Sequence, residues 1–192
     1  MEAIFKDNQY LIRRKMFSFP GRKYQIFNAQ GQQVLYSYQK AFKLKEDIRV
    51  YADEAMTQER LVIQARQIID FSAAYDIVDP TEKRKVGAVR RKGLKSILQD
   101  TWEFLNDDDQ PIATLTEDST TMALLRRFLT NLIPQSYHVE ANGTRLVEYV
   151  QNFNPFVLKL NVEIKPEGRN VLDPRVILGA GILLAAVEGR QG

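Results

Sequence analysis

The amino-acid sequence predicts a mainly β protein: a closed antiparallel barrel of about twelve strands around a buried hydrophobic C-terminal helix, with one amphipathic helix on its surface. Short alternating runs, each opened by an aromatic residue and followed by a polar turn and a second apolar run, begin at Tyr24, Tyr75, Trp102 and Tyr137. Alternation has the two-residue period of a β-strand. An uncharged segment, residues 176–187, predicts a helix with protein on all sides.

The strand-like pattern recurs along the chain, separated by turns rich in Asn, Asp, Gly and Pro. The predicted strands are residues 9–16, 22–28, 32–39, 46–52, 59–66, 73–78, 85–91, 98–106, 110–116, 135–141, 144–151 and 156–164. Asn142-Gly143 is the strongest hairpin signal among the turns. In the last strand an apolar face alternates with a face that carries Lys159 and Glu163, which is typical of an antiparallel strand with one solvated face.

Residues 119–134 interrupt the strand pattern and predict the amphipathic helix. Ser119 is a suitable N-cap residue, and Pro134 ends the segment. An apolar stripe at helical spacing is formed by Met122, Leu125, Leu129 and Leu132. We expect this helix to lie on the outside of the sheet.

The hydrophobic C-terminal segment is too short to span a membrane. As a helix, residues 176–187 would rise about 18 Å, against a bilayer hydrocarbon core of about 30 Å. Asp173 and Pro174 fit the N-cap and first helical position, and Glu188 follows the segment directly. Since a helix that is apolar all round must be buried all round, we expect it to fill the barrel.

Composition and motifs predict one domain, residues 1–192, without an enzymatic site. The chain has no cysteine, so disulfides and thiolate catalysis are excluded, and a reducing, cytoplasmic location is expected. Asp107-Asp108-Asp109 is interpreted as a turn, and His138 has no second histidine with which to bind a metal. No Gly-rich phosphate loop is present. We therefore expect no catalytic residue, metal or cofactor.

Positive charge is concentrated in two segments: residues 1–45 carry a net charge of +7 and residues 81–95 of +6, in a chain whose net charge is +3. The candidate anion- or lipid-binding residues are Lys83, Arg84, Lys85, Arg90, Arg91, Lys92 and Lys95, together with Arg13, Arg14 and Lys15. Such a run favours contact with an anionic membrane surface, but it is also typical of a solvated hairpin. The same charges would attract the phosphates of nucleic acid. The sequence, however, shows no aromatic-rich surface that could contact bases.

Several segments resemble the LURP-one-related group of the Tubby-like superfamily, whose relatives include the phospholipid scramblases. In chain order the segments are RLVIQARQI, YDIVDPTEKRKVGAVRRK, TMALLRRFL and the terminal LDPRVILGAGILLAAVE, and the resemblance runs from about Tyr10 to Val187. It implies a twelve-stranded barrel around a hydrophobic C-terminal helix. Tubby domains bind anionic phosphoinositides through surface Lys and Arg, which implies an anionic phospholipid partner here.

The chain departs from the scramblase pattern before its last helix. Residues 163–173 mix acidic with basic side chains, whereas a calcium loop needs a dense set of oxygen ligands. A scramblase-like activity is therefore disfavoured. The expected function is that of a non-enzymatic barrel, peripheral at the membrane, that binds anionic phospholipid through basic exterior segments. The alternative is a regulatory or scaffold protein that contacts protein or nucleic acid.

Overall fold

The computed structural model describes residues 2–15, 21–40, 47–66, 74–92, 101–118, 135–152 and 156–188. The strands are β1 (Gln9–Lys15), β2 (Gly21–Asn28), β3 (Gln33–Lys40), β4 (Ile48–Tyr51), β5 (Glu59–Ala65), β6 (Ala74–Asp79), β7 (Arg84–Arg91), β8 (Thr101–Leu105), β9 (Pro111–Glu117), β10 (Ser136–Ala141), β11 (Thr144–Asn152) and β12 (Val157–Ile164). Their bounds lie within one residue of the predicted ones wherever the predicted bound is a described residue.

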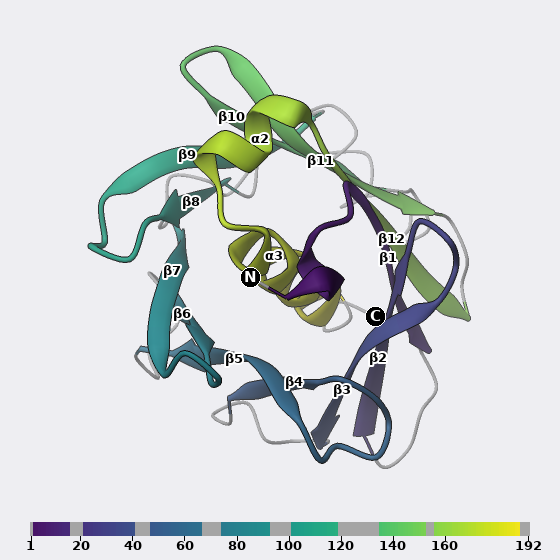
Figure 1. Cartoon of the computed structure of the whole chain (residues 1–192). Helices are drawn as coiled ribbons and strands as arrows, with labels where there is room; N and C mark the ends of the chain where they lie inside the picture. The colour runs from purple at the N-terminus through teal and green to yellow at the C-terminus, as the bar shows by residue number, and fades with distance from the viewer. Residues whose placement is uncertain are drawn as a thin grey trace.

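The strands form one closed antiparallel barrel. Each strand pairs with its neighbours in the sequence, and β1 closes the ring by pairing with both β2 and β12. Figure 1 shows the ring from one end. The predicted fold class, a mainly β closed barrel of twelve strands, is confirmed. Each strand therefore has a paired neighbour on both of its sides.

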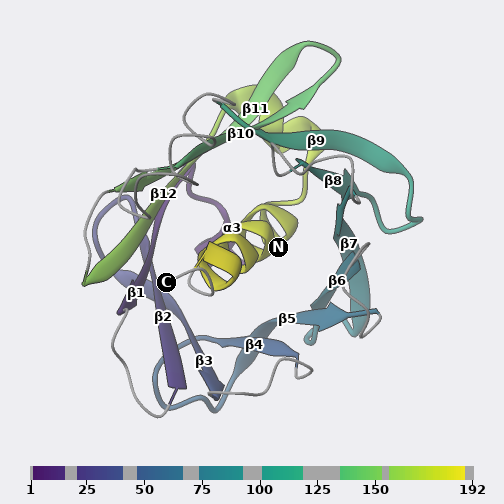
Figure 2. The same cartoon turned by 180° about the vertical axis from the view of Figure 1, so that it is seen from behind.

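Helix α3 (Pro174–Glu188) lies inside the ring, as Figures 1 and 2 show from opposite ends. Its large apolar side chains are buried: Val176, Ile177, Leu178, Ile182, Leu183 and Leu184. A Cβ atom at Gly179 would lie 2.7 Å from Ile77 Cδ1, and one at Gly181 would lie 2.7 Å from Ile12 Cδ1. The glycines therefore let the helix approach the barrel wall on two sides. Within the described residues, no helix has both the length and the apolarity needed to cross a membrane.

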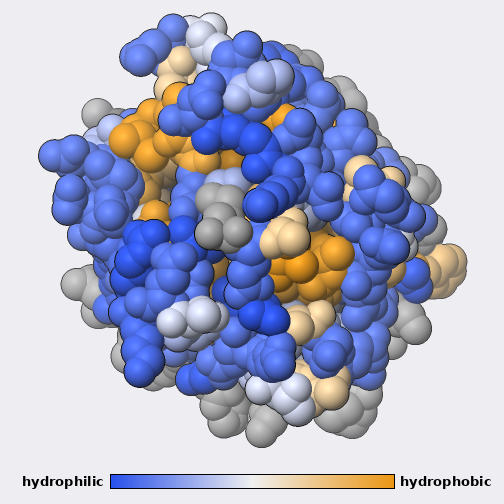
Figure 3. Space-filling model, viewed as in Figure 1, coloured by the Kyte–Doolittle hydropathy of each residue, from blue (hydrophilic) through white to orange (hydrophobic). Residues whose placement is uncertain are grey.

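Short helical segments cover the end of the barrel from which α3 starts. They are the 3₁₀ turn η1 (Ala3–Phe5) and the helix α2 (Pro166–Val171), which the sequence pattern did not predict. Arg169 of α2 joins them by donating to the carbonyl oxygens of Phe5 and Asp7. Figure 3 shows mostly hydrophilic residues at this end, with hydrophobic residues visible between them. The predicted amphipathic helix, residues 119–134, lies outside the described residues.

Candidate anion-binding surfaces

The two basic segments lie on opposite sides of the barrel. β1 lies between β12 and β2, whereas β7 lies between β6 and β8, six strands away around the ring. Figure 1 shows β1 and β7 across the ring from each other. The two segments therefore cannot form one continuous patch.

Carboxylates neutralise much of the β7 segment. Glu103 of β8 binds both Arg90, at 2.6 Å, and Lys92, at 2.9 Å. Burial alone would raise the pKa of Glu103, but its hydrogen bonds to Lys92 and Arg90 outweigh that effect and lower the pKa. This carboxylate therefore stays ionised beside the two cations and cancels part of their charge.

The rest of this segment has mixed surroundings. Lys85 lies 2.9 Å from Asp109, and Arg84 lies 2.7 Å from Glu82. Lys83 is exposed in the β6–β7 turn, where its φ is +51°. Arg91 is half-buried, and Lys95 lies outside the described residues. Most of the sequence-predicted lipid-binding residues on β7 are thus solvated members of ion pairs.

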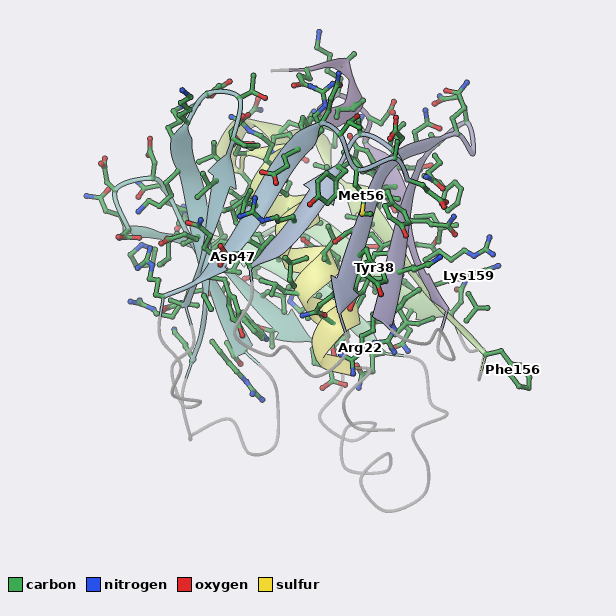
Figure 4. All side chains as sticks on the ribbon, turned by 90° about the horizontal axis from the view of Figure 1, so that it is seen from below. Arg22, Tyr38, Asp47, Met56, Phe156 and Lys159 are labelled. Carbon is green, nitrogen blue, oxygen red and sulfur yellow. The ribbon has the colours of Figure 1, made fainter. Side chains whose placement is uncertain are left out.

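Arg14 was predicted as an exterior anion-binding residue, and the structure contradicts this. Its side chain points into the barrel, is only 2% exposed and donates from Nη1 to the carbonyl oxygen of Ala185 at 3.0 Å. Arg22 donates to the next carbonyl, that of Ala186, and Figure 4 shows Arg22 beside the end of α3. The two guanidinium groups satisfy carbonyls that end α3 and oppose the negative end of its dipole. Arg14 is therefore a helix cap.

Arg13 points to the outside of the barrel, because neighbouring residues of a strand face opposite sides. Lys159 of β12 stands directly opposite Arg13 on one flank, and Gln25 of β2 on the other. Lys23, two residues before Gln25, is exposed on the same outer side of β2. We call Arg13, Lys23 and Lys159 the cationic face. Within the described part of the chain, none of the three lies within 4.0 Å of a carboxylate oxygen.

Lys23 and Lys159 were not among the sequence-predicted site residues. The alternation of residues 156–164 did predict that Lys159 faces solvent. It could not predict that β12 pairs with β1, which brings Lys159 opposite Arg13. The third sequence-predicted residue of this segment, Lys15, ends β1.

Exposed apolar side chains flank the cationic face. Phe156, immediately before β12, is 68% exposed, the largest exposed fraction among the large hydrophobic residues that the structure describes. Val150 is also exposed, on β11, the other neighbour of β12. Figure 4 shows Phe156 and Lys159 projecting outward on the same side of the molecule. Cations beside a protruding aromatic ring make this region amphipathic.

The remaining polar candidates have structural partners. The tripeptide Asp107-Asp108-Asp109 forms the β8–β9 turn, as predicted, and Asp109 adopts a φ of +65°. His138 faces outward, and its Nδ1 lies 2.5 Å from Asp118. Among the described residues, no group of three or more His, Asp or Glu side chains could hold a metal ion.

A small apolar cavity lies between α3 and strands β7, β8 and β9. Its volume is about 10 Å³, and it is lined by Val89, Trp102, Phe104, Leu115, Ala180, Leu183 and Leu184. This is about the space that one water molecule needs, and the lining offers no side-chain carboxylate, amine or hydroxyl. The cavity is therefore too small for a metabolite or an acyl chain.

Residues 33–184, from β3 to within α3, match the family model described as LURP-one-related. No curated protein matches the chain. No solved structure matches it either. The family is thus shown by a match to most of the barrel.

Proposed function

Because the chain belongs to the LURP-one-related family, we propose that it is a non-enzymatic barrel that binds anionic phospholipid at a membrane surface through the cationic face. The observation that carries the proposal is the difference in counterions between the two basic surfaces. Arg90 and Lys92 share Glu103, whereas the cationic face has no carboxylate within ion-pair distance among the described residues.

The charge of this face suits weak, reversible binding. A Lys or Arg near an anionic surface contributes about 1 kcal/mol, and the effect fades within a Debye length. Three such residues therefore supply about 3 kcal/mol, enough for peripheral and salt-sensitive attachment. We assign the binding to the cytoplasmic leaflet, which is the leaflet rich in anionic lipids.

The exposed Phe156 favours a lipid surface over nucleic acid. In segments that bind a membrane surface, Phe, Trp and Leu side chains enter the boundary between headgroups and acyl chains while Lys and Arg contact the anionic lipids. Phe156 and Lys159 project on one side of the barrel, so both can reach one flat surface. Duplex DNA would contact the cations through its phosphates, but its paired bases would not cover this ring.

Co-sedimentation with vesicles tests the proposal. We expect the purified chain to bind vesicles of phosphatidylcholine with phosphatidylserine more strongly than vesicles of phosphatidylcholine alone. Binding should rise with the anionic fraction and fall as salt is added. Phe156→Ser should weaken binding at every salt concentration, and Met56→Ser, which changes another exposed apolar residue, serves as its control.

Equal recovery with neutral and anionic vesicles at low salt would refute the membrane proposal. A parallel measurement with duplex DNA separates the alternative, because retention on DNA at physiological salt without vesicle binding would indicate a nucleic-acid partner.

A further inference from the structure

The barrel consists of two halves, β1–β6 and β7–β12, whose pairing registers coincide. Arg13 and Arg14 of β1 stand opposite Gln25 and Tyr24 of β2. Arg90 and Arg91 of β7 stand opposite Glu103 and Trp102 of β8 in the same arrangement. Superposing β1 on β7 therefore superposes β2 on β8, residue by residue.

Two register shifts recur at equivalent places in both halves, whereas the β6–β7 shift between Ile77 and Val78 has no counterpart where β12 pairs with β1. The β2–β3 register shifts between Ile26 and Phe27, and the β8–β9 register shifts between Phe104 and Leu105. Likewise, the β4–β5 shift follows Val50, and the β10–β11 shift follows Val139. Bulges are local features of a strand, so their recurrence supports the equivalence independently of strand number.

The turns after β2 and β8 also coincide. In the first, Asn28 Oδ1 accepts from the backbone N–H of Gln32 at 2.8 Å. In the second, Asn106 Oδ1 accepts from the backbone N–H of Gln110 at 2.8 Å. Both turns contain one residue with positive φ, at the third position after the asparagine. The two halves can thus be compared side chain by side chain.

The outward arginines of the two halves, Arg13 and Arg90, have neighbours of opposite charge. On the flank away from Glu103, Arg90 stands opposite Ala74 of β6. The equivalent flank of Arg13 holds Lys159. Arg90 therefore has a small neutral neighbour and an acidic one, whereas Arg13 has a basic neighbour and a neutral amide.

Arg13 also has an unsatisfied donor. Its Nε is buried and has no hydrogen-bond partner in the described structure, as is also the case for Arg14 Nε and Arg60 Nε. The amide of Gln25 is directed elsewhere, donating to Gln33 and to Glu54 of the β4–β5 turn. Like charges that face each other across two strands destabilise a sheet. Arg13 and Lys159 thus have no carboxylate partner among the described residues, whereas Arg90 of β7 has Glu103.

We infer that Arg13 and Lys159 form a binding site for a doubly charged phosphomonoester group, on the flank of Arg13 whose equivalent in the other half-barrel holds the neutral Ala74. A guanidinium binds two phosphate oxygens through its planar fork, and an ammonium adds a second positive charge. A dianion can neutralise both cations, whereas a phosphodiester carries one charge. The inference rests on the proposed function only for the source of this group, a lipid headgroup.

Vesicles of equal surface charge test the class of ligand. Phosphatidic acid presents a phosphomonoester and phosphatidylglycerol a phosphodiester, so the two are mixed into phosphatidylcholine vesicles at matched zeta potential. We expect stronger binding to phosphatidic acid, and a loss of about fivefold for Arg13→Gln and for Lys159→Gln. Arg90→Gln, the equivalent change in the other half, should bind as the unmodified chain does. Urea unfolding of each variant verifies that the barrel is intact.

Exchanging the equivalent side chains gives a reciprocal test. Gln25→Glu places a carboxylate beside Arg13, and repulsion from Glu54 directs it there, so binding should fall. Glu103→Gln removes the carboxylate beside Arg90, as in the surroundings of Arg13, so binding should rise. Unchanged binding in Arg13→Gln and Lys159→Gln would overturn the site, while anionic vesicle binding by the unmodified chain would leave the proposed function standing. Equal binding to the two lipids would overturn the phosphomonoester class.

A second experiment, without lipid, distinguishes a lipid headgroup from a soluble phosphomonoester as the ligand. Thermal unfolding is followed in inorganic phosphate and in chloride at equal ionic strength. A phosphate-specific rise in Tm that Arg13→Gln abolishes supports the site even if no vesicle binds, and would then identify a soluble phosphomonoester as the ligand. An equal rise in Tm for Arg13→Gln and for the unmodified chain would overturn the phosphate site at Arg13.

Discussion

Arg175 Nη1, at the start of α3, lies 2.5 Å from Asp79 Oδ2, at the end of β6. Both side chains are buried, and Arg175 also binds Asp173, at 2.6 Å. The contact joins the inner helix to the β6–β7 hairpin, two parts of the chain nearly a hundred residues apart. Asp79 in turn accepts from the backbone N–H groups of Thr81 and Glu82, so one carboxylate holds both the hairpin turn and the helix.

Arg175→Ala should destabilise the protein by about 3–5 kcal/mol, because it leaves Asp79 buried without its charged partner. Urea unfolding followed by circular dichroism measures the change. Arg84→Ala removes the exposed pair with Glu82 and should cost no more than about 1 kcal/mol. Similar losses for the two variants would contradict a structural role for the buried pair.

Stability should fall in acid, in part through Asp79. Burial would raise the pKa of Asp79, but the Glu82 N–H, the Arg175 guanidinium and the Thr81 N–H outweigh it and hold the pKa below its ordinary value of 3.8. A depressed pKa adds stability that is complete above about pH 4 and is lost as pH falls through the folded-state pKa. Asp79→Asn should flatten the decline of unfolding free energy below pH 4, whereas Asp108→Asn in the exposed β8–β9 turn should not.

The strands were predictable because alternation is a local property that the barrel preserves. Asn142-Gly143 also lies in the turn that its sequence indicates. Helix α2 was missed because its six residues contain Pro and Gly and are too few for a helical period. The site was harder to predict. Whether a cation has a counterion depends on register, which places Glu103 opposite Arg90 but Gln25 opposite Arg13.

Arg13 and Arg14 are neighbours in the chain, but their replacement should affect stability to different extents. Arg14→Ala should lower the unfolding free energy by about 1.5–3 kcal/mol, because a buried charged hydrogen bond to Ala185 is lost. Arg13→Ala should change it by no more than about 0.5 kcal/mol, since it also removes repulsion from Lys159. Urea unfolding of the two variants at equal ionic strength compares them. A larger loss for Arg13→Ala would contradict the assigned orientations.

Gly87 lies where β7 approaches both β8 and α3. A Cβ atom there would lie 2.7 Å from the carbonyl oxygen of Leu105 and 2.7 Å from Val176 Cγ2, and its φ of +155° is rarely adopted by other residues. Gly31 also has a positive φ, +74°, but open space around it. Gly31→Ala should cost about 1 kcal/mol, and Gly87→Ala about 1–3 kcal/mol more because of the close contacts. Equal costs in urea unfolding would show that the contacts are relieved without strain.

Removal of residues 173–192 should abolish cooperative folding. The deletion takes away α3, whose six large buried side chains each contribute roughly 1.5–3 kcal/mol, as well as Arg175 and the carbonyls that Arg14 binds. Typical domains are stable by only about 5–15 kcal/mol. The free energy lost with α3 is of the same size, so the strands alone should not fold stably. We expect an insoluble product, or a soluble one without a sigmoidal urea transition. A soluble truncated chain with a cooperative transition would show that the barrel closes without its inner helix.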